Sequence, residues 1–235
     1  MANLTERFFD SKEELTAQLS TLLESKLVAG IEEKGSAVLF VSGGSSPAPA
    51  YKHLSGLPLA WDKISVAMVD ERWVDANHEK SNEAFIKSTL LQNHASKARF
   101  VTMKNSAPTA IVGQAECEQA YKSLGQADVT ILGMGPDGHT ASLFPHANGL
   151  EHGLSTADVV CAINAKQSEV TGSITERMTL TLNGIANSKQ VVLLISGDEK
   201  KAVYEQAKQA GSEYDIPLRA VINHPDINLS VFWCP

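Results

Sequence analysis

The sequence predicts an α/β fold built on a doubly wound, mainly parallel sheet. Short apolar runs rich in β-branched residues alternate along the chain with longer helical patterns, which is the order expected of βαβ units. The 235 residues are 43% hydrophobic and 20% charged, values typical of a globular chain that can bury its own core. No internal repeat, low-complexity tract or long linker interrupts the pattern, so we expect residues 1–235 to form a single domain.

Five runs are predicted to be strands buried on both faces, because they are short and continuously apolar. A closing segment, residues 228–233, is a candidate for one more strand. Four stretches with helical spacing lie among them, several starting near Ser or Thr. The strands are residues 37–41, 64–69, 129–132, 159–163 and 191–195, and the helices are residues 13–33, 81–92, 109–124 and 199–210.

The formal net charge of −7 argues against a nucleic acid or an anionic membrane surface as the main partner. It does not exclude a small anionic ligand, because a local group of Arg and Lys can dominate one cleft. The longest apolar run, residues 191–195, is far too short to span a bilayer. No obligate protein partner is indicated.

The cysteines are Cys117, Cys161 and Cys234, an odd number at wide spacing. They form neither a disulfide framework nor a zinc pattern, so we expect buried thiols in a reducing cytosol. The early charges and a capping box at residues 11–14 favour a helix near the N-terminus over a signal peptide. A cytoplasmic protein is the expected result.

The loops that follow strands are where ligands bind in such sheets. After residues 37–41 comes SGGSSP (42–47), whose glycines let the backbone turn its amides toward a ligand and whose proline suits the start of a helix. A strand, a glycine turn and a helix N-terminus favour a phosphate site. A tight βα turn with a Ser N-cap explains the same residues, and both interpretations stay open. The loop is not a Walker motif, since no Gly-Lys-Ser/Thr follows.

Three charged residues follow the strand at 64–69, in the segment DERW (70–73). Charges at the end of a buried strand cost desolvation unless they pair or face a cleft. The segment is therefore either a solvated junction or a carboxylate and a guanidinium displayed at the mouth of a cleft.

The third loop is LGMGPDGHTASLFP (132–145). Its glycines match G-x-G-x-x-G, with Asp158 twenty residues beyond the last, which invites a dinucleotide interpretation. Pro145 interrupts the long helix that this interpretation needs, so we reject it. Asp137 and His139 in a glycine-rich bend instead suggest a general-base imidazole beside a carboxylate that orients it. A capping Asp and a surface His are the alternative.

Two later cations and one absence complete the pattern. Arg177 starts an alternating segment, and Lys200 stands near a helix start, where a cation opposes the helix dipole. The placement of Lys200 is easier to understand if it meets an anion than if it is solvated, but for each cation alone both interpretations stay open. No G-x-S-x-G elbow or catalytic Cys signature appears, and the histidines lack metal-ligand spacing. If the chain is a hydrolase, we expect water to be the attacking group and no metal or cofactor to be needed.

Six ordered stretches together resemble the 6-phosphogluconolactonase branch of the glucosamine-6-phosphate isomerase/6-phosphogluconolactonase family. The resemblance spans nearly the whole chain, and GMGPDGHTASLFP is highly specific. The stretches are VSGGSSP (41–47), VDERWV (69–74), SNEAFIKSTLL (81–91), LGMGPDGHTASLFP (132–145), ERMTLTL (176–182) and SGDEKKAV (196–203).

The resemblance implies a Rossmann-like sheet, a small-molecule sugar-phosphate lactone as substrate and no cofactor. The expected reaction is hydrolysis of 6-phospho-D-glucono-1,5-lactone to 6-phosphogluconate, in the oxidative pentose phosphate pathway. By motif, the residues that should hold the phosphate are Gly43, Gly44, Ser45, Arg177 and Lys200. Those that should surround the reacting ring are Asp70, Arg72, Asp137 and His139, with His139 as base, Asp137 or Asp70 orienting it, and Arg72 stabilising the oxyanion or the leaving group.

Phe144 separates the two branches. The isomerase/deaminase branch resembles DGH followed by I-A-F-N-E-P, with a glutamate at the place of Phe144, and has Tyr at the place of Arg72. Both departures favour lactone hydrolysis. The alternatives are a glucosamine-6-phosphate isomerase or deaminase and a non-catalytic sugar-phosphate sensor. The C-terminal segment VFWCP lacks an acidic residue expected of lactonases. This departure affects only what the resemblance implies for the C-terminal tail.

Overall fold

Seven parallel strands form the central sheet, in the order β1-β10-β9-β6-β2-β3-β5. The computed structural model describes residues 3–235. The α/β fold with a mainly parallel sheet is therefore confirmed. The strands are β1 (Asn3–Phe8), β2 (Ala37–Val41), β3 (Ile64–Met68), β5 (Arg99–Val101), β6 (Val129–Gly133), β9 (Val191–Ser196) and β10 (Asn228–Cys234).

The strand order reverses between β2 and β6. From β2 the chain moves through β3 to β5 at one edge, and from β6 it moves through β9 to β10 toward the other. The loops after β2 and β6 therefore diverge to opposite faces and leave a crevice between them, which is where ligands bind in open α/β sheets.

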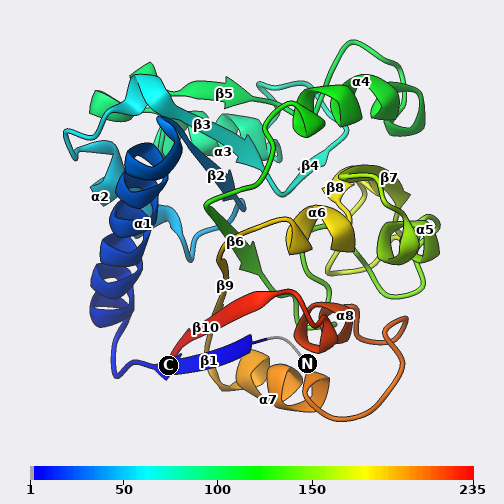
Figure 1. Cartoon of the computed structure of the whole chain (residues 1–235). Coiled ribbons are helices and arrows are strands. Elements are labelled where there is room, and N and C mark those ends of the chain that lie inside the picture. The colour runs from blue at the N-terminus through cyan, green and yellow to red at the C-terminus, as the bar shows by residue number, and fades with distance from the viewer. Residues whose placement is uncertain (1–2) are drawn as a thin grey trace.

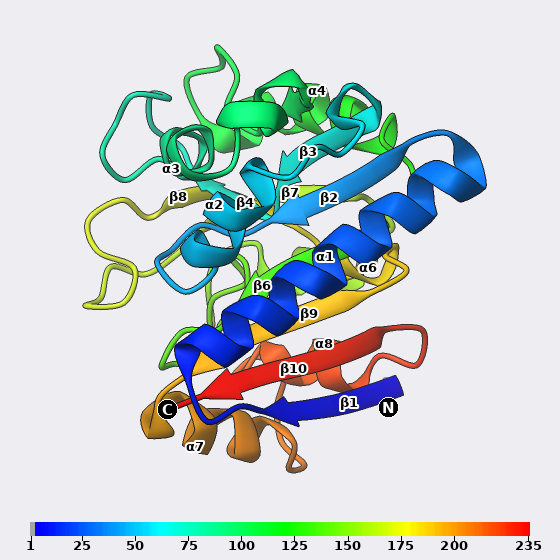
Figure 2. The ribbon, with the colours of Figure 1, turned by 90° about the vertical axis from the view of Figure 1, so that its left-hand side faces the viewer.

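Helices cover both faces of this sheet (Figure 1). On one face α1 lies over the sheet, running roughly along the strands as Figure 2 shows, and contacts α2. Leu19, Leu23 and Leu27 of α1 are fully buried, because a spacing of four places them on one side of the helix. The helices are α1 (Lys12–Lys34), α2 (Ala48–Ser55), α3 (Asn82–Thr89), α4 (Ala110–Lys122), α5 (Leu150–Ser155), α6 (Leu182–Ala186), α7 (Asp198–Ala207) and α8 (Leu218–Asn223), with 3₁₀ turns η1 (Trp61–Lys63) and η2 (Asn93–Lys97).

The four predicted helices are confirmed with small shifts at their ends, because their caps follow the sequence. Ser11, Ser81 and Thr109 each accept a hydrogen bond from a first-turn backbone N–H of α1, α3 and α4. The predicted thiols are also confirmed: Cys117, Cys161 and Cys234 are free and buried.

A second, three-stranded antiparallel sheet, β4-β8-β7, lies on the face opposite α1 (Figure 1). Its strands are β4 (Asp70–Arg72), β7 (Val160–Asn164) and β8 (Glu176–Leu180). We expected the strand at 159–163 to belong to the parallel sheet, and that was wrong. An apolar run indicates that a strand is buried, but it does not indicate which sheet the strand joins. Here β7 packs against α4 and α5 and is not part of the main sheet.

Helix α4 supplies hydrogen bonds along the outer edge of β7. Glu118 accepts from the N–H groups of Val159 (3.0 Å) and Val160 (2.8 Å), and Gln114 accepts from that of Ala162 (2.9 Å). Side chains thus occupy the positions that a neighbouring strand would take. This contact fixes the small sheet, and with it β4, against the rest of the fold.

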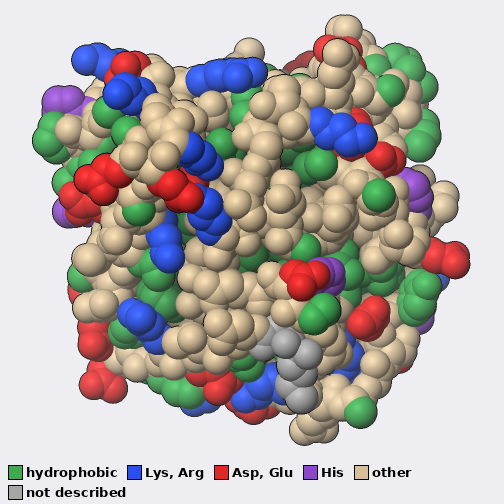
Figure 3. Space-filling model, viewed as in Figure 1, with side chains coloured by type: hydrophobic (Ala, Val, Ile, Leu, Met, Phe, Trp, Pro, Cys, Tyr) green, Lys and Arg blue, Asp and Glu red, His purple; other side chains and the backbone are tan. Residues whose placement is uncertain are grey.

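The face turned to the viewer in Figure 3 carries Lys and Arg interspersed with Asp and Glu, without a large patch of one sign. Over residues 3–235, no helix is both long enough and apolar enough to cross a membrane.

Candidate active site

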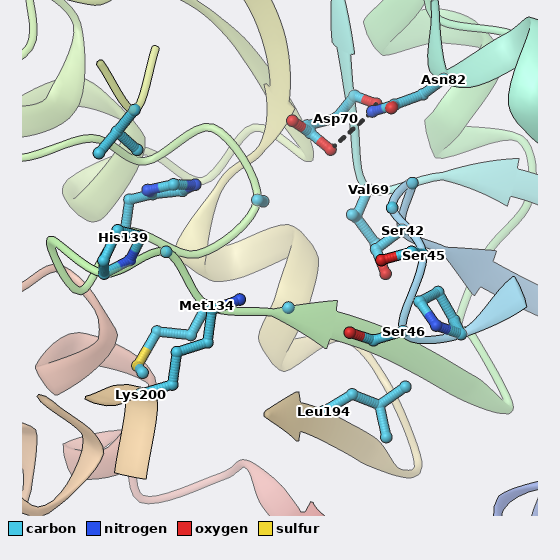
Figure 4. A pocket seen from close by; sticks show the side chains of 18 of the residues that line it. Ser42, Ser45, Ser46, Val69, Asp70, Asn82, Met134, His139, Leu194 and Lys200 are labelled. Carbon is cyan, nitrogen blue, oxygen red and sulfur yellow. Dashed lines mark hydrogen bonds between the residues drawn. The ribbon is translucent and has the colours of Figure 1, made fainter. Parts of the chain in front are cut away.

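A cleft of about 550 Å³ lies at the carboxyl ends of four neighbouring strands, β9, β6, β2 and β3. In Figure 4, His139 and Lys200 stand on one side and Asp70 and Asn82 on the other, with Ser45 and Ser46 beside them. Because parallel strands end at the same edge, segments far apart in sequence converge here. The lining residues are Ser42, Gly43, Gly44, Ser45, Ser46, Pro47, Val69, Asp70, Arg72, Asn82, Gly133, Met134, Gly135, Pro136, His139, Ala141, Glu169, Val170, Leu194 and Lys200.

The loop after β6 is a compact bend that presents His139. The Gly135 N–H donates to the His139 carbonyl (3.0 Å), and Thr140 Oγ1 donates to the Gly133 carbonyl (2.8 Å). A Cβ on Gly135 would lie 2.1 Å from His139 Cε1, so the imidazole fits only because this residue is glycine. No helix follows until α5 at Leu150, which agrees with rejecting the dinucleotide interpretation.

His139 Nδ1 lies 2.5 Å from Asp137 Oδ1, which also accepts the His139 backbone N–H at 3.1 Å. Burial alone would raise the pKa of Asp137, but the hydrogen bonds and charge of His139 hold that pKa below its usual value. An ionised carboxylate accepts a hydrogen bond from Nδ1–H, so Nε2 of the neutral imidazole keeps its lone pair. With its side chain 19% exposed at the cleft wall, His139 has the geometry of a general base.

Phe144 packs against this imidazole, with 4.3 Å between the ring centroids, and is buried. The residue that separates the two branches by sequence therefore contacts the candidate base. An apolar ring at this place supplies no carboxylate to His139. The carboxylate that contacts the imidazole is that of Asp137.

Asp70 lies on the other wall, at the start of β4. Its Oδ2 accepts from Ser142 Oγ (2.6 Å), and its Oδ1 accepts from Asn82 Nδ2 (3.1 Å). Both oxygens are thus held by neutral donors, and the contact to His139 comes from Asp137. Asp70 is placed to accept a hydrogen bond from a ligand hydroxyl in the cleft.

The Arg72 guanidinium has hydrogen-bond partners at Nη1 but, in the described part of the chain, not at Nε. Its Nη1 donates to the Lys80 carbonyl (2.7 Å) and to Asn82 Oδ1 (3.1 Å). Its Nε is buried, and within residues 3–235 it has no hydrogen-bond partner. A buried unpaired donor costs about 1–3 kcal/mol.

The glycine loop, residues 42–47, connects β2 to α2, which begins at Ala48 directly after Pro47 as predicted. Gly44 adopts a φ of 98°, a conformation that favours glycine. Across the described chain, the backbone N–H groups of Gly43, Gly44 and Ser45 have no protein acceptor. They are therefore available to an anion at this side of the cleft.

Lys200 reaches the cleft from the first turn of α7, after β9. Burial lowers the pKa of Lys200, and the neighbouring Glu199 offsets part of that effect. Among the residues that the structure describes, no carboxylate forms an ion pair with it. A half-buried, unpaired ammonium that faces the same cleft as the free amides is suited to bind an anion.

Arg177 differs from the other predicted phosphate ligands, because it is not among the residues that line the cleft. It is 3% exposed, and its Nε and Nη2 donate to the carbonyls of Ile174 (3.0 Å) and Thr171 (2.9 Å). Burial lowers its pKa to about 10, with Asp70 opposing and Arg72 adding to the decrease. The guanidinium anchors the loop that brings Glu169 and Val170 to the cleft.

Sequence reasoning missed several residues of the site. Asn82 and Ser142 position Asp70, and Ala141 lines the cleft with a φ of 48° that is rare for a residue with a Cβ. Asn82 and Ser142 stand within the stretches that carry the resemblance, but an Asn or Ser beside a helix or turn has an ordinary capping explanation. Glu169 had no signal, since its place depends on loop packing.

Over residues 3–235, no group of three or more His, Cys, Asp and Glu side chains is arranged to hold a metal ion.

The model of the family described as glucosamine-6-phosphate isomerases/6-phosphogluconolactonase matches residues 10–233. The chain belongs to this family. A curated 6-phosphogluconolactonase of Mesorhizobium japonicum is 37% identical to it over 230 residues, covering 97% of this chain and 94% of the relative. The family resemblance inferred from the six stretches is therefore confirmed.

Solved structures of this family have the same fold. A crystal structure of a 6-phosphogluconolactonase from Shewanella baltica gives a TM-score of 0.91 at 36% identity, covering 99% of this chain and 98% of that one. A monomeric glucosamine-6-phosphate deaminase gives 0.77 at 24% identity, covering 98% and 97%. The second similarity shows the fold alone, so the fold does not separate the family's two activities.

The Asp137 carboxylate should make stability depend on pH. The pKa of Asp137 is lower in the folded protein than in the unfolded chain, where it is about 3.9, so the ionised carboxylate stabilises the fold. This stabilisation is fully present above the unfolded-state pKa. It is lost as the pH falls through the lower pKa of the folded protein. We expect Asp137→Asn to have a lower free energy of unfolding than the unmodified protein in urea at pH 7, and this difference should become smaller at acidic pH. If the difference in the free energy of unfolding stayed constant down to pH 2, the ionised Asp137 carboxylate would not be what stabilises the fold.

Proposed function

We propose that this protein hydrolyses the ring ester of 6-phospho-D-glucono-1,5-lactone to 6-phosphogluconate by general-base activation of water. One observation carries the proposal: a His139–Asp137 pair faces a cleft whose neighbouring walls offer an unpaired lysine and free loop amides. A base and an anion site that face the same cleft fit a substrate that carries an ester and a phosphate. The names of the relatives agree with this substrate.

In the proposed reaction, His139 Nε2 takes a proton from water as the water oxygen attacks the lactone carbonyl carbon. Asp137 stabilises the resulting imidazolium through Nδ1. The tetrahedral intermediate then collapses, the bond between the carbonyl carbon and the ring oxygen breaks, and the imidazolium returns the proton to the ring oxygen. Arg72, whose side chain lines the cleft, stabilises the developing oxyanion.

The phosphate lies at the glycine loop and Lys200 in this proposal. Gly43, Gly44 and Ser45 contribute backbone N–H groups, and Lys200 contributes a charge-assisted contact. Arg177, placed behind the wall, supports the site by holding the loop at Thr171 and Ile174 and by adding positive charge near Asp70.

Ring isomerisation or deamination is disfavoured by Phe144. The isomerase/deaminase branch has a carboxylate at that place, and here a phenyl ring packs against the base instead. A non-catalytic sugar-phosphate sensor is disfavoured because the base, its orienting carboxylate and a guanidinium that lines the cleft are all present.

The cellular setting is part of the proposal. Burial raises the pKa of Cys117 and of Cys161 to about 12, so both remain unreactive thiols, which fits the reducing cytosol. The activity would form the hydrolytic step of the oxidative pentose phosphate pathway, with a small-molecule substrate and no nucleic acid or membrane partner.

The test is to add purified protein to freshly generated lactone and to follow acid release against a no-enzyme control, since the lactone also opens unaided. We expect acid release well above that background. The same preparation is incubated with glucosamine 6-phosphate and assayed for fructose 6-phosphate and ammonia. Formation of these products without lactone hydrolysis would overturn the proposal in favour of the deaminase, and no turnover of either would favour the sensor.

A further inference from the structure

Asn82 is a buried polar residue that the proposed mechanism does not use. It is 5% exposed, begins α3 and lines the cleft. Its backbone N–H donates to Oε1 of Glu71 at 2.8 Å, and Glu71, itself 1% exposed, also accepts from the N–H of Glu83 and from Ser81 Oγ. The buried Glu71 carboxylate thereby fixes the backbone at Asn82.

The side-chain amide of Asn82 connects the two charged residues of its wall. Its Nδ2 donates to the Asp70 carbonyl (2.9 Å) and to Asp70 Oδ1 (3.1 Å, the dashed contact in Figure 4), while its Oδ1 accepts from Arg72 Nη1 (3.1 Å). The opposite amide orientation would place oxygen against both Asp70 acceptors and nitrogen against the guanidinium. The neighbours therefore specify one orientation.

The same amide also packs against the glycine loop. A Cβ on Gly43 would lie 2.1 Å from Asn82 Oδ1, so the loop approaches this side chain as closely as a glycine allows. Asn82 thus contacts three parts of the site at once: the carboxylate of Asp70, the guanidinium of Arg72 and the first glycine of the anion loop.

The contact to Asn82 helps to fix the orientation of the Arg72 guanidinium, which lines the cleft. Nη1 donates both to Asn82 and to the Lys80 carbonyl, so one nitrogen of the group is held by two acceptors. Without Asn82, Nη1 would lose its side-chain acceptor, and the guanidinium could turn toward Asp70, whose Oδ1 would at the same moment lose its donor.

We propose that Asn82 is a positioning residue that keeps Asp70 and Arg72 apart and holds the Arg72 guanidinium where it can meet the developing oxyanion. The inference rests on the proposed lactone hydrolysis for its substrate. The amide oxygen and nitrogen of Asn82 are already bonded to these two residues, so Asn82 acts on the reaction through them and its loss should lower kcat more than it raises KM.

The first test compares Asn82→Asp and Asn82→Ala with the unmodified protein. Asn82→Asp keeps the shape that packs against Gly43 but replaces the donor to Asp70 by an acceptor, so it separates hydrogen bonding from packing. We expect each variant to lose roughly 10–100-fold in kcat with a smaller change in KM. Asn105→Ala is the matched control, since Asn105 is a half-buried asparagine bonded to Gly113 and Ala107 away from the cleft, and it should affect only the melting temperature.

A double-mutant cycle then asks whether Asn82 acts through Arg72. If it does, Asn82→Ala combined with Arg72→Ala should be hardly slower than Arg72→Ala alone, because the residue it positions is already gone. Full additivity, or an Asn82→Asp variant with unchanged kcat, would overturn the proposal. Should Asn82→Asp fail to fold, Asn82→Ala and the cycle still decide.

A crystal structure of Asn82→Ala distinguishes this inference from the proposed function. We expect the Arg72 guanidinium to turn away from its position in the unmodified protein, and an unmoved guanidinium would overturn the inference whatever the enzyme's substrate. Failure of the unmodified protein to hydrolyse the lactone would instead overturn the proposed function and leave the structural comparison decisive for Asn82.

Discussion

His139→Asn should lower kcat for lactone hydrolysis by about 10²–10⁴-fold, the usual contribution of a positioned general base. Asparagine can still donate a hydrogen bond toward Asp137, but it cannot take a proton from water at neutral pH. The anion site at residues 43–45 and Lys200 is untouched, so KM should change little. Initial rates over a range of lactone concentrations, corrected for spontaneous opening, provide the measurement.

His146→Asn is the matched control for this experiment. His146 is exposed, pairs with Asp215 (2.9 Å) and does not line the cleft. Its φ of 52° is also one that asparagine adopts readily. If His139→Asn kept the full rate, the base would lie elsewhere and the Asp137–His139 pair would be structural.

Lys200→Ala should reduce kcat/KM for the phosphorylated lactone by about 10–150-fold, which corresponds to the roughly 1.5–3 kcal/mol of a charge-assisted contact. Turnover of unphosphorylated gluconolactone should stay the same, because no phosphate is present to lose its partner. The melting temperature should not fall, since burial disfavours this ammonium in the free protein. The measurements are steady-state kinetics on both lactones and thermal unfolding.

Lys201→Ala controls for the loss of a lysine from α7. The Lys201 ammonium lies 3.9 Å from the centre of the Trp233 ring and does not line the cleft, so its loss should not change the preference for the phosphorylated lactone. Equal losses on both lactones for Lys200→Ala would mean that the residue supports the cleft generally and that the phosphate binds elsewhere.

The sequence predicted the elements whose pattern is long or fully apolar. The strands β2, β3, β6 and β9 are mainly apolar runs rich in β-branched residues, and α1 has 23 residues with a Ser N-cap. The elements that were missed are short or exposed: β5 has three residues, and β1 is exposed along most of its length. A period cannot be recognised over three residues, and an edge strand need not be apolar.

For the site, the sequence could predict which residues gather but not what each one contacts. His139, Asp70, Arg72 and Lys200 line one cleft because they follow neighbouring parallel strands. Whether Asp137 or Asp70 contacts His139 depends on the bend of one loop, which sequence spacing leaves open. The burial of Arg177 under residues 171–174 depends on a loop with no periodic pattern at all.

The side chains of Gln114 and Glu118 along β7 have a consequence for association between molecules. An open strand edge is a template on which another chain can add a strand, and proteins avoid aggregation by covering such edges. Here two side chains of α4 cover the edge of β7, and no further strand is needed. Gln114 and Glu118 lie one helical turn apart and accept from alternate N–H groups of β7. We expect a change at either residue to expose a place where copies of the protein can join edge to edge.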